Sequence, residues 1–202
     1  FMGEDMQTSS QQMTQIRWHG RGGQGAITAA KVVAEAMFKS GYGGVVMAPT
    51  FGTERRGAPV STSLKVSREK IYDLSPIQTP DIVLVLDYLI LNEVDVTVGL
   101  KQGGLLILNS PRPVNEHQFP NFRVAVANVT KLGIEAGLRK GIVNSGIIGA
   151  LGKAGGLVDI KMLTRCIASE FSGRKPEENA KAAELVYNAT EICEPSIGGS
   201  DA

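Results

Sequence analysis

Short apolar runs along the chain predict the strands of a sheet. The run at 81–87 is continuous and bounded by aspartates, which is typical of a parallel strand covered on both faces. Residues 60–66 alternate instead, which predicts a half-exposed strand. In chain order, the predicted strands are 16–19, 45–48, 60–66, 81–87, 105–109 and 123–127.

Helical periodicity lies between and after these strands. Residues 26–39 place apolar side chains on one face, and Gly41 suits the end of that helix. Asp159 and Pro176 are start signals for two later helices. The helices expected after the last strand are 134–140, 145–154, 160–171 and 177–193. Strands that alternate with helices predict a three-layer α/β/α Rossmann-like domain with a mostly parallel sheet and a helical C-terminal part.

The length of 202 residues suits one domain, which we place at 15–194. Residues 1–14 are polar and lack the apolar stretch of a secretory signal. We expect them to be either a disordered N-terminal segment or a remnant that is not native. Residues 195–202 are expected to form a frayed tail.

Composition excludes several classes of protein. The net charge of +1 gives no bias toward nucleic acid or an anionic membrane, and no apolar run reaches the ~18 residues of a spanning helix. The two cysteines, Cys166 and Cys193, lie far apart, which fits a reducing, cytoplasmic location and excludes an iron–sulfur site within the chain. With two histidines in all, a histidine-based metal site is not expected either.

A glycine-rich loop joins the first predicted strand to the first helix. Its sequence fits G-x-G-x-x-G, and its residues are Gly20, Arg21, Gly22, Gly23, Gln24 and Gly25. Glycines let backbone amides approach a phosphate, and the helix start adds unpaired N–H groups and partial positive charge. Arg21 is a candidate for a further charged contact. The alternative is that these glycines serve only a tight strand-to-helix crossover.

The loop lacks the acid that accompanies an NAD site. Such a site places an acidic residue at the end of the second strand, for the ribose hydroxyls. Here that position falls at 45–48, which holds no acid, and Glu54 lies beyond it in a loop. We therefore favour a phosphate-bearing ligand other than NAD, or a diphosphate held only in part by this chain.

A second polar cluster, 51–58, follows the second predicted strand and should emerge beside the glycine loop. Its Arg55 and Arg56 are candidates to meet phosphates or the carboxylates of a partner, with a solvated surface charge as the alternative for at least one of them. Asp87, the last residue of the 81–87 run, is expected at the same edge. Its more ordinary role would be the N-cap of a helix beginning at Tyr88.

At these residues the chain resembles a known family. Four ordered stretches, at 16–26, 52–59, 80–87 and 144–150, resemble motifs of the gamma subunit of pyruvate:ferredoxin oxidoreductase and its 2-oxoacid relatives. In order they read IRWHGRGGQGA, GTERRGAP, PDIVLVLD and NSGIIGA. The glycine motif alone would be weak, but four in family order make the resemblance specific.

The resemblance implies oxidative decarboxylation of a 2-oxoacid, acyl transfer to coenzyme A and electron transfer to ferredoxin. It also implies that thiamine diphosphate, Mg and [4Fe–4S] clusters reside on alpha, beta and delta subunits or their fusions, so that the isolated chain is inactive and holds no catalytic residue. The site residues 20–25, Arg55 and Arg56 would help to present coenzyme A as co-substrate.

Other functions remain open at this point. The chain could serve a 2-oxoglutarate, branched-chain, aryl or indolepyruvate oxidoreductase instead of a pyruvate enzyme. It could also be an NAD-binding dehydrogenase subunit, or a purely structural subunit whose glycine loop binds nothing. A partner-facing surface is expected partly at 50–58, with Phe51 as an apolar anchor.

Overall fold

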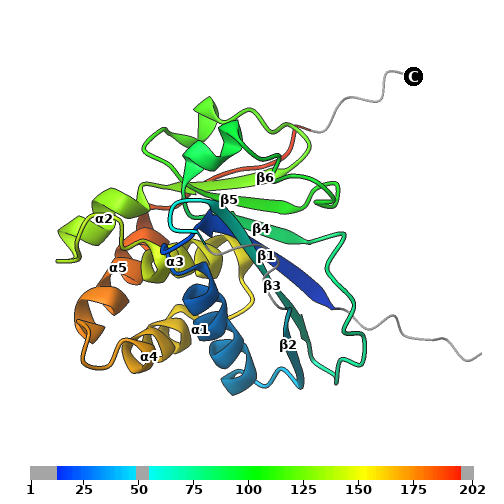
Figure 1. The fold of residues 1–202 in the computed structure, drawn as a ribbon, viewed down its shortest axis with the longest axis horizontal. Helices are drawn as coiled ribbons and strands as arrows, with labels where there is room; N and C mark the ends of the chain where they lie inside the picture. Colours follow the sequence, from blue (N-terminus) through cyan, green and yellow to red (C-terminus); the bar gives the residue numbers. More distant parts are fainter. Residues whose placement is uncertain (1–12, 49–54, 197–202) are drawn as a thin grey trace, which may run out of the picture.

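The computed structural model describes residues 13–48 and 55–196. Figure 1 shows their arrangement, an open sheet with helices packed against it. Its strands and helices are, in chain order, β1 (Thr14–Arg21), α1 (Ala26–Lys39), β2 (Gly44–Ala48), β3 (Pro59–Ser67), β4 (Ile82–Val85), the 3-10 helix η1 (Tyr88–Asn92), β5 (Leu105–Asn109), the 3-10 helix η2 (Val114–Glu116), β6 (Arg123–Ala127), α2 (Val129–Glu135), α3 (Asn144–Gly155), α4 (Ile160–Glu170), α5 (Pro176–Ala189) and β7 (Glu191–Cys193).

The strands of the described residues form one seven-stranded sheet in the order β2-β3-β1-β4-β5-β6-β7. β1, β4, β5 and β6 are parallel neighbours. β3 is antiparallel to both β1 and β2, and β7 is antiparallel to β6. The predicted α/β class with a mostly parallel sheet is therefore confirmed, and β3 and β7 make the sheet mixed.

The two faces of the sheet are covered differently. Alternate strand residues such as Ile16, Trp18 and Leu84 pack into one large core with side chains from the α-helices. The opposite residues, such as Val83 and Leu106, pack under η1 and the irregular connections around it. In the described residues the α-helices thus lie on one face, as Figure 1 shows, and 3-10 turns and loops supply the third layer.

Several predicted elements are confirmed. The helix predicted at 26–39 is found with those bounds, and Gly41 follows it with a φ of 89°. Asp159 caps α4 by accepting a hydrogen bond from the Lys161 backbone N–H, and Pro176 is the first residue of α5. These elements could be predicted because local cap chemistry and periodicity agree.

Three predictions were wrong in part. The helix predicted at 134–140 lies earlier, at Val129–Glu135, because Gly137 and Gly141 hold positive φ angles of 98° and 94° in a turn. The helix predicted to reach 193 ends at Ala189, and β7 follows it along the edge of the sheet. The strand at 60–66 is half-exposed only at its start, since Leu64–Ser67 is buried on both faces. The segments predicted to lie outside the domain fall almost wholly beyond the described residues.

Candidate functional site

Gly22 joins the glycine loop to the segment 55–58. Its N–H donates to the Ala58 carbonyl at 2.9 Å, and its carbonyl accepts from the Gly57 N–H at 3.1 Å. A Cβ on Gly22 would overlap the Arg55 carbonyl oxygen. This position therefore needs glycine for close packing of two loops, and its N–H is already used. The expectation that 51–58 emerges beside the glycine loop is confirmed for 55–58, while 51–54 lies outside the described residues.

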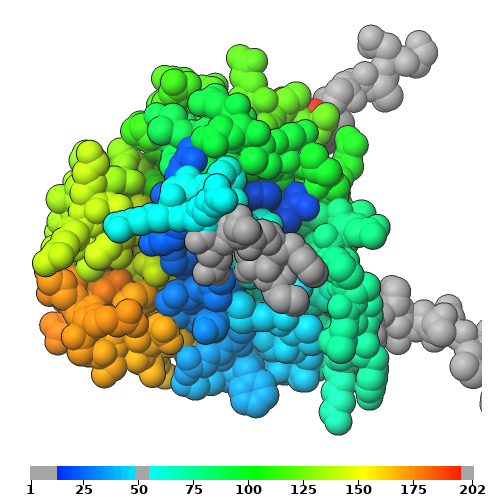
Figure 2. Space-filling view, in the orientation of Figure 1, coloured from blue at the N-terminus to red at the C-terminus, as the bar shows by residue number. Residues whose placement is uncertain are grey.

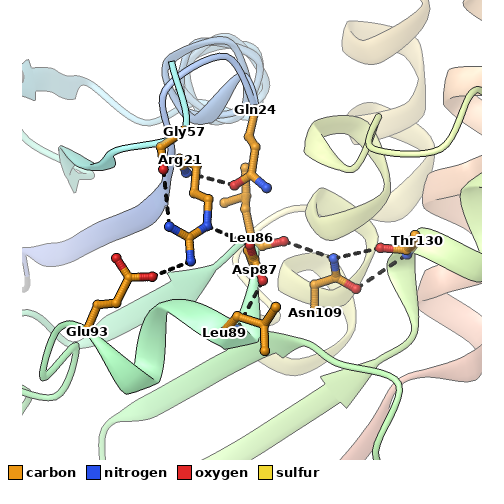
Figure 3. A network of polar contacts seen from close by, with 9 residues as sticks. All are labelled: Arg21, Gln24, Gly57, Leu86, Asp87, Leu89, Glu93, Asn109 and Thr130. Carbon is orange, nitrogen blue, oxygen red and sulfur yellow. Dashed lines mark hydrogen bonds and ion pairs between the residues drawn. The ribbon is translucent and has the colours of Figure 1, made fainter. Parts of the chain in front are cut away.

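Arg21 is held by two carboxylates (Figure 3). Its Nε lies 2.8 Å from Oδ2 of Asp87, and its Nη2 lies 2.6 Å from Oε1 of Glu93. Its Nη1 donates to the Gly57 carbonyl at 3.1 Å. The hydrogen bonds to Glu93 and then Asp87 raise the pKa of Arg21 above its usual value. Arg21 thus ties the loop to the end of β4 and to η1, and its charge is compensated within the chain.

The turn is closed by Gln24, the other side chain of the motif that makes a loop contact. The side-chain Oε1 of Gln24 accepts from the Arg21 backbone N–H at 2.7 Å. The backbone N–H of Gln24 donates to the Arg21 carbonyl at 2.9 Å. Asp87 lies below this turn and accepts from the Leu89 N–H at 3.0 Å. The predicted N-cap role of Asp87 is confirmed, and the ion pair with Arg21 is added to it.

Among the residues that the structure describes, no side chain caps the start of α1. Gly25 occupies the N-cap position with a φ of 80° and has no side-chain oxygen that could accept from the N–H groups of the first turn. A Cβ on Gly25 would lie 2.5 Å from Nδ2 of Asn144, so the start of α3 packs directly against the loop. The N–H groups of Ala26, Ile27 and Thr28 come before the first N–H that donates within the helix, which is that of Ala29 to the Gly25 carbonyl.

A cavity of about 440 Å³ opens over this helix start. Arg56 lies on its rim, and no ion pair of Arg56 is found within residues 13–48 and 55–196. Arg55 is exposed and is not among the lining residues. The lining consists of Arg21, Gly22, Gly23, Gly25, Ala26, Ile27, Thr28, Arg56 and Val60. Backbone amides at a helix start and guanidinium groups are the kinds of group that bind anions in proteins.

A family model described as pyruvate ferredoxin/flavodoxin oxidoreductase matches residues 15–189. The chain belongs to this family. The resemblance inferred from the four motifs is therefore confirmed.

Relatives of this oxidoreductase chain match it over nearly its full length. The "Pyruvate/ketoisovalerate oxidoreductases common subunit gamma" of Thermococcus kodakarensis is 43% identical, covering 90% of this chain and 100% of the relative. The "Pyruvate synthase subunit PorC" of Methanocaldococcus jannaschii is 38% identical, with 87% and 96% covered. Among solved structures, pyruvate oxidoreductase subunit PORC of Thermotoga maritima matches with a TM-score of 0.76 and 27% identity, covering 90% of this chain and 99% of that one.

A second cavity of this oxidoreductase chain was missed by the sequence analysis. It measures about 570 Å³ and lies where β4, β5 and β6 end, with Gln24 in its wall. Its floor is organised by Asn109, which is buried and donates to the Leu86 carbonyl at 2.9 Å and to Thr130 Oγ1 at 3.2 Å (Figure 3). The remaining lining includes Asp87, Tyr88, Leu89, Pro111, Asn128, Lys140, Gly141 and Val143. The sequence did contain a feature that could have indicated this cavity, because the apolar strand β5 ends in a polar residue, Asn109.

Metal-binding groups are not gathered in the part of the family domain that the structure describes. Across residues 13–48 and 55–196, no three His, Cys, Asp or Glu side chains come together as a metal ligand set. Cys166 is buried, Cys193 is exposed, and they form no disulfide. No helix of those residues has the length and hydropathy to cross a membrane.

Proposed function

We propose that this chain is the gamma subunit of a heteromeric pyruvate:ferredoxin oxidoreductase, and that the cavity over α1 binds phosphate groups of coenzyme A. The observation that supports the ligand is the start of α1, which has no cap from the side chain of its N-cap residue and whose first residues line the cavity together with Arg56. Coenzyme A carries a diphosphate and a ribose phosphate, which are the anions that such an arrangement recognises.

The residues present fit this group. The cavity of about 440 Å³ falls within the ~300–1,000 Å³ of ordinary ligand sites. The backbone N–H groups of Ala26, Ile27 and Thr28 would bind phosphate oxygens, and Arg56 would contribute a charged contact. Arg21 would act indirectly, because its guanidinium is occupied by Asp87 and Glu93 and holds the loop in place. Coenzyme A supplies the thiol that accepts the acyl group.

Sheet topology disfavours NAD as the ligand. In a dinucleotide-binding sheet the ribose acid closes a parallel strand beside the first strand. Here the neighbour of β1 on that side is the antiparallel β3, and β2 lies one strand further out. β2 also ends in Val46, Met47 and Ala48, none of which is acidic. Titration with NAD while the fluorescence of the buried Trp18 is followed would test this alternative directly.

The other cofactors of the reaction belong, in this proposal, to partner subunits. The sequence has no Gly-Asp-Gly motif for a thiamine diphosphate metal and has two cysteines in all. Thiamine diphosphate, Mg and [4Fe–4S] clusters would therefore be held by alpha, beta and delta subunits or their fusions, with ferredoxin as the electron acceptor. We place the complex in the cytoplasm, where such reduced clusters are compatible with free thiols.

Pyruvate is the 2-oxoacid that we propose, because both relatives compared above carry pyruvate in their names. The first of them also names ketoisovalerate, so a branched-chain 2-oxoacid is the second candidate. Steady-state rates of the assembled complex with each 2-oxoacid would separate the two.

Arg56 and Arg55 form a matched pair for testing the coenzyme A site. In the assembled complex, Arg56→Ala should raise the KM for coenzyme A by about tenfold, the effect of losing one charge-assisted contact. The KM for pyruvate and kcat at saturating coenzyme A should stay unchanged. Arg55→Ala, outside the cavity, should change no constant by more than about twofold. Equal effects of the two variants on coenzyme A would contradict the proposed site.

A further inference from the structure

The connection between β3 and β4, residues 68–81, contains no helix or strand. Ordered connections longer than ~12 residues are uncommon and are usually functional. Both ends of this one are fixed to the body of the domain. The Gly43 N–H donates to the Arg68 carbonyl, and the Lys101 N–H donates to the Pro80 carbonyl, each at 3.1 Å.

The middle of the connection is fixed by a buried lysine. Lys65 points away from the helix-side core and is 2% exposed. Its Nζ donates to Asp73 Oδ2 at 2.8 Å, to the Asp73 carbonyl at 3.2 Å and to Ser75 Oγ at 3.4 Å. These acceptors use all three protons of the ammonium, which a buried charge requires. The other oxygen of Asp73 accepts from the Ser75 N–H at 2.9 Å, so the segment is held as one unit.

This arrangement leaves two apolar side chains, Tyr72 and Leu74, exposed to solvent. Tyr72 and Leu74 flank Asp73 and are 82% and 73% exposed, the highest fractions among the large hydrophobic side chains of the described residues. Asp73 is directed inward to Lys65, so its two neighbours project outward. Figure 2 shows the teal segment protruding at the lower right of the molecule. The ion pair between the buried Lys65 and the half-exposed Asp73 thus helps to hold a tyrosine and a leucine in water.

We propose that Tyr72 and Leu74 are anchors that dock this chain into an apolar pocket on another subunit of its oxidoreductase complex. The proposal rests on the proposed place of the chain in such a complex. A loop that is ordered before binding loses little conformational entropy on docking. Tyrosine, with its large apolar area, is enriched among the residues that carry interface energy.

The chemistry of the loop indicates an apolar protein pocket as its partner. Asp73 is paired with Lys65, and Arg68 donates to the Ser40 carbonyl and stacks 4.0 Å from the centre of the Tyr42 ring. The charges of Asp73 and Arg68 are therefore engaged within the chain, which favours an apolar over an anionic partner surface at Tyr72 and Leu74.

The occupant that we propose is a different subunit and not a second copy of this chain. The relatives of this chain are named as subunits of oxidoreductases, the "common subunit gamma" of Thermococcus kodakarensis and "subunit PorC" of Methanocaldococcus jannaschii. A chain of this kind meets other subunits when its complex assembles.

The experiment begins with the wild-type chain co-expressed with alpha, beta and delta subunits, since co-purification of that complex tests the proposed function separately. The variant Tyr72→Ser with Leu74→Ser should raise the dissociation constant for assembly at least tenfold. Ile134→Ser, at a half-exposed position on α2, is the matched control and should stay within about twofold. Circular dichroism melts of the purified chains should show both variants folded. An unchanged assembly constant in the double variant overturns the proposal.

Two further measurements identify the partner and the role of the lysine. A photo-crosslinking phenylalanine derivative in place of Tyr72 should join the chain to another subunit. A crosslink to a second copy of this chain, or no crosslink within the assembled complex, overturns the proposal. Lys65→Met keeps both apolar anchors but removes the tie, and it should also weaken assembly. Assembly as tight as in the wild type would show that the buried lysine does not position them.

Discussion

Arg21 of the glycine loop and Asp87 at the end of β4 form an ion pair with 2.8 Å between Nε and Oδ2. Because Asp87 also caps η1, the pair connects the start of α1 with the opposite face of the sheet. The arginine of the glycine loop thus neutralises protein carboxylates. Positive potential over the cavity comes instead from the helix start and from Arg56.

Replacing Arg21 should therefore lower the stability of the chain more than it weakens ligand binding. Arg21→Ala removes two ion pairs and a hydrogen bond at a side chain that is 22% exposed, and should cost about 1–2 kcal/mol. For a chain of this size the melting temperature should fall by about 3–6 °C. Differential scanning calorimetry of the purified chain measures this fall in melting temperature. Arg55→Ala is the control, and a variant as stable as that control would contradict the structural role.

Gly22 and Gly23 should respond differently to a methyl group. Gly22→Ala sets a Cβ against the Arg55 carbonyl and should cost about 1–3 kcal/mol while displacing the 55–58 segment. Gly23→Ala meets nothing closer than 3.9 Å, so its cost of about 1 kcal/mol comes from the positive φ of 90°. Trypsin cleavage after Arg55 or Arg56 should accelerate markedly in Gly22→Ala and little in Gly23→Ala. Equal cleavage rates would show that Gly22 does not hold the segment.

The fold was predictable where the signal is local. Helix α1 has its predicted bounds because amphipathic spacing, a preceding glycine and Gly41 agree within one stretch of chain. β7 was missed because it pairs with β6, whose residues lie far away in the sequence. The end of α5 was missed as well, because it depends on the extended backbone conformation of Thr190 and not on a glycine or proline. The burial of Lys65 was equally hidden, since Asp73 and Ser75 reach it from an irregular connection.

The position of the candidate site could be predicted from the sequence, but the separate roles of its arginines could not. Motif and strand order placed the glycine loop beside 55–58, which the contacts of Gly22 confirm. The partners of Arg21 were not predictable, because Glu93 lies in a stretch without a motif and its reach depends on η1. Nothing in the sequence distinguished Arg56, which lines the cavity, from the adjacent Arg55.

Asn109 should be the structural centre of the second cavity. Asn109→Ala leaves the Leu86 carbonyl and the Thr130 N–H without their partner in a buried setting, at a cost of about 1–3 kcal/mol. Asn128→Ala removes only the N-cap of α2 and should cost about 1 kcal/mol. Urea unfolding of both variants measures the difference. A smaller loss for Asn109→Ala than for Asn128→Ala would contradict its role.

His19 should make the stability of the chain sensitive to mild acid. Burial, followed by the charge of Arg17, lowers the pKa of His19 from 6.5 to about 4, and its Nε2 accepts from Arg17 Nε at 3.1 Å. Between these two values the unfolded chain binds a proton that the folded chain does not. The free energy of unfolding therefore falls as the pH drops from about 6.5 toward 4, by about 2–3 kcal/mol.

His19→Gln isolates this contribution, because glutamine can still accept from Arg17 but does not titrate. Urea unfolding at pH 7.5 and at pH 4.5 should show that the wild type loses about 2–3 kcal/mol more than the variant over this interval. The carboxylates of the chain titrate in both proteins and cancel in the comparison. The two chains should differ least at pH 7.5, where His19 is neutral whether folded or unfolded. If their losses are the same, His19 takes up its proton as readily in the folded chain as in the unfolded one, and the strand face that carries Arg17 and His19 is better hydrated than its burial indicates.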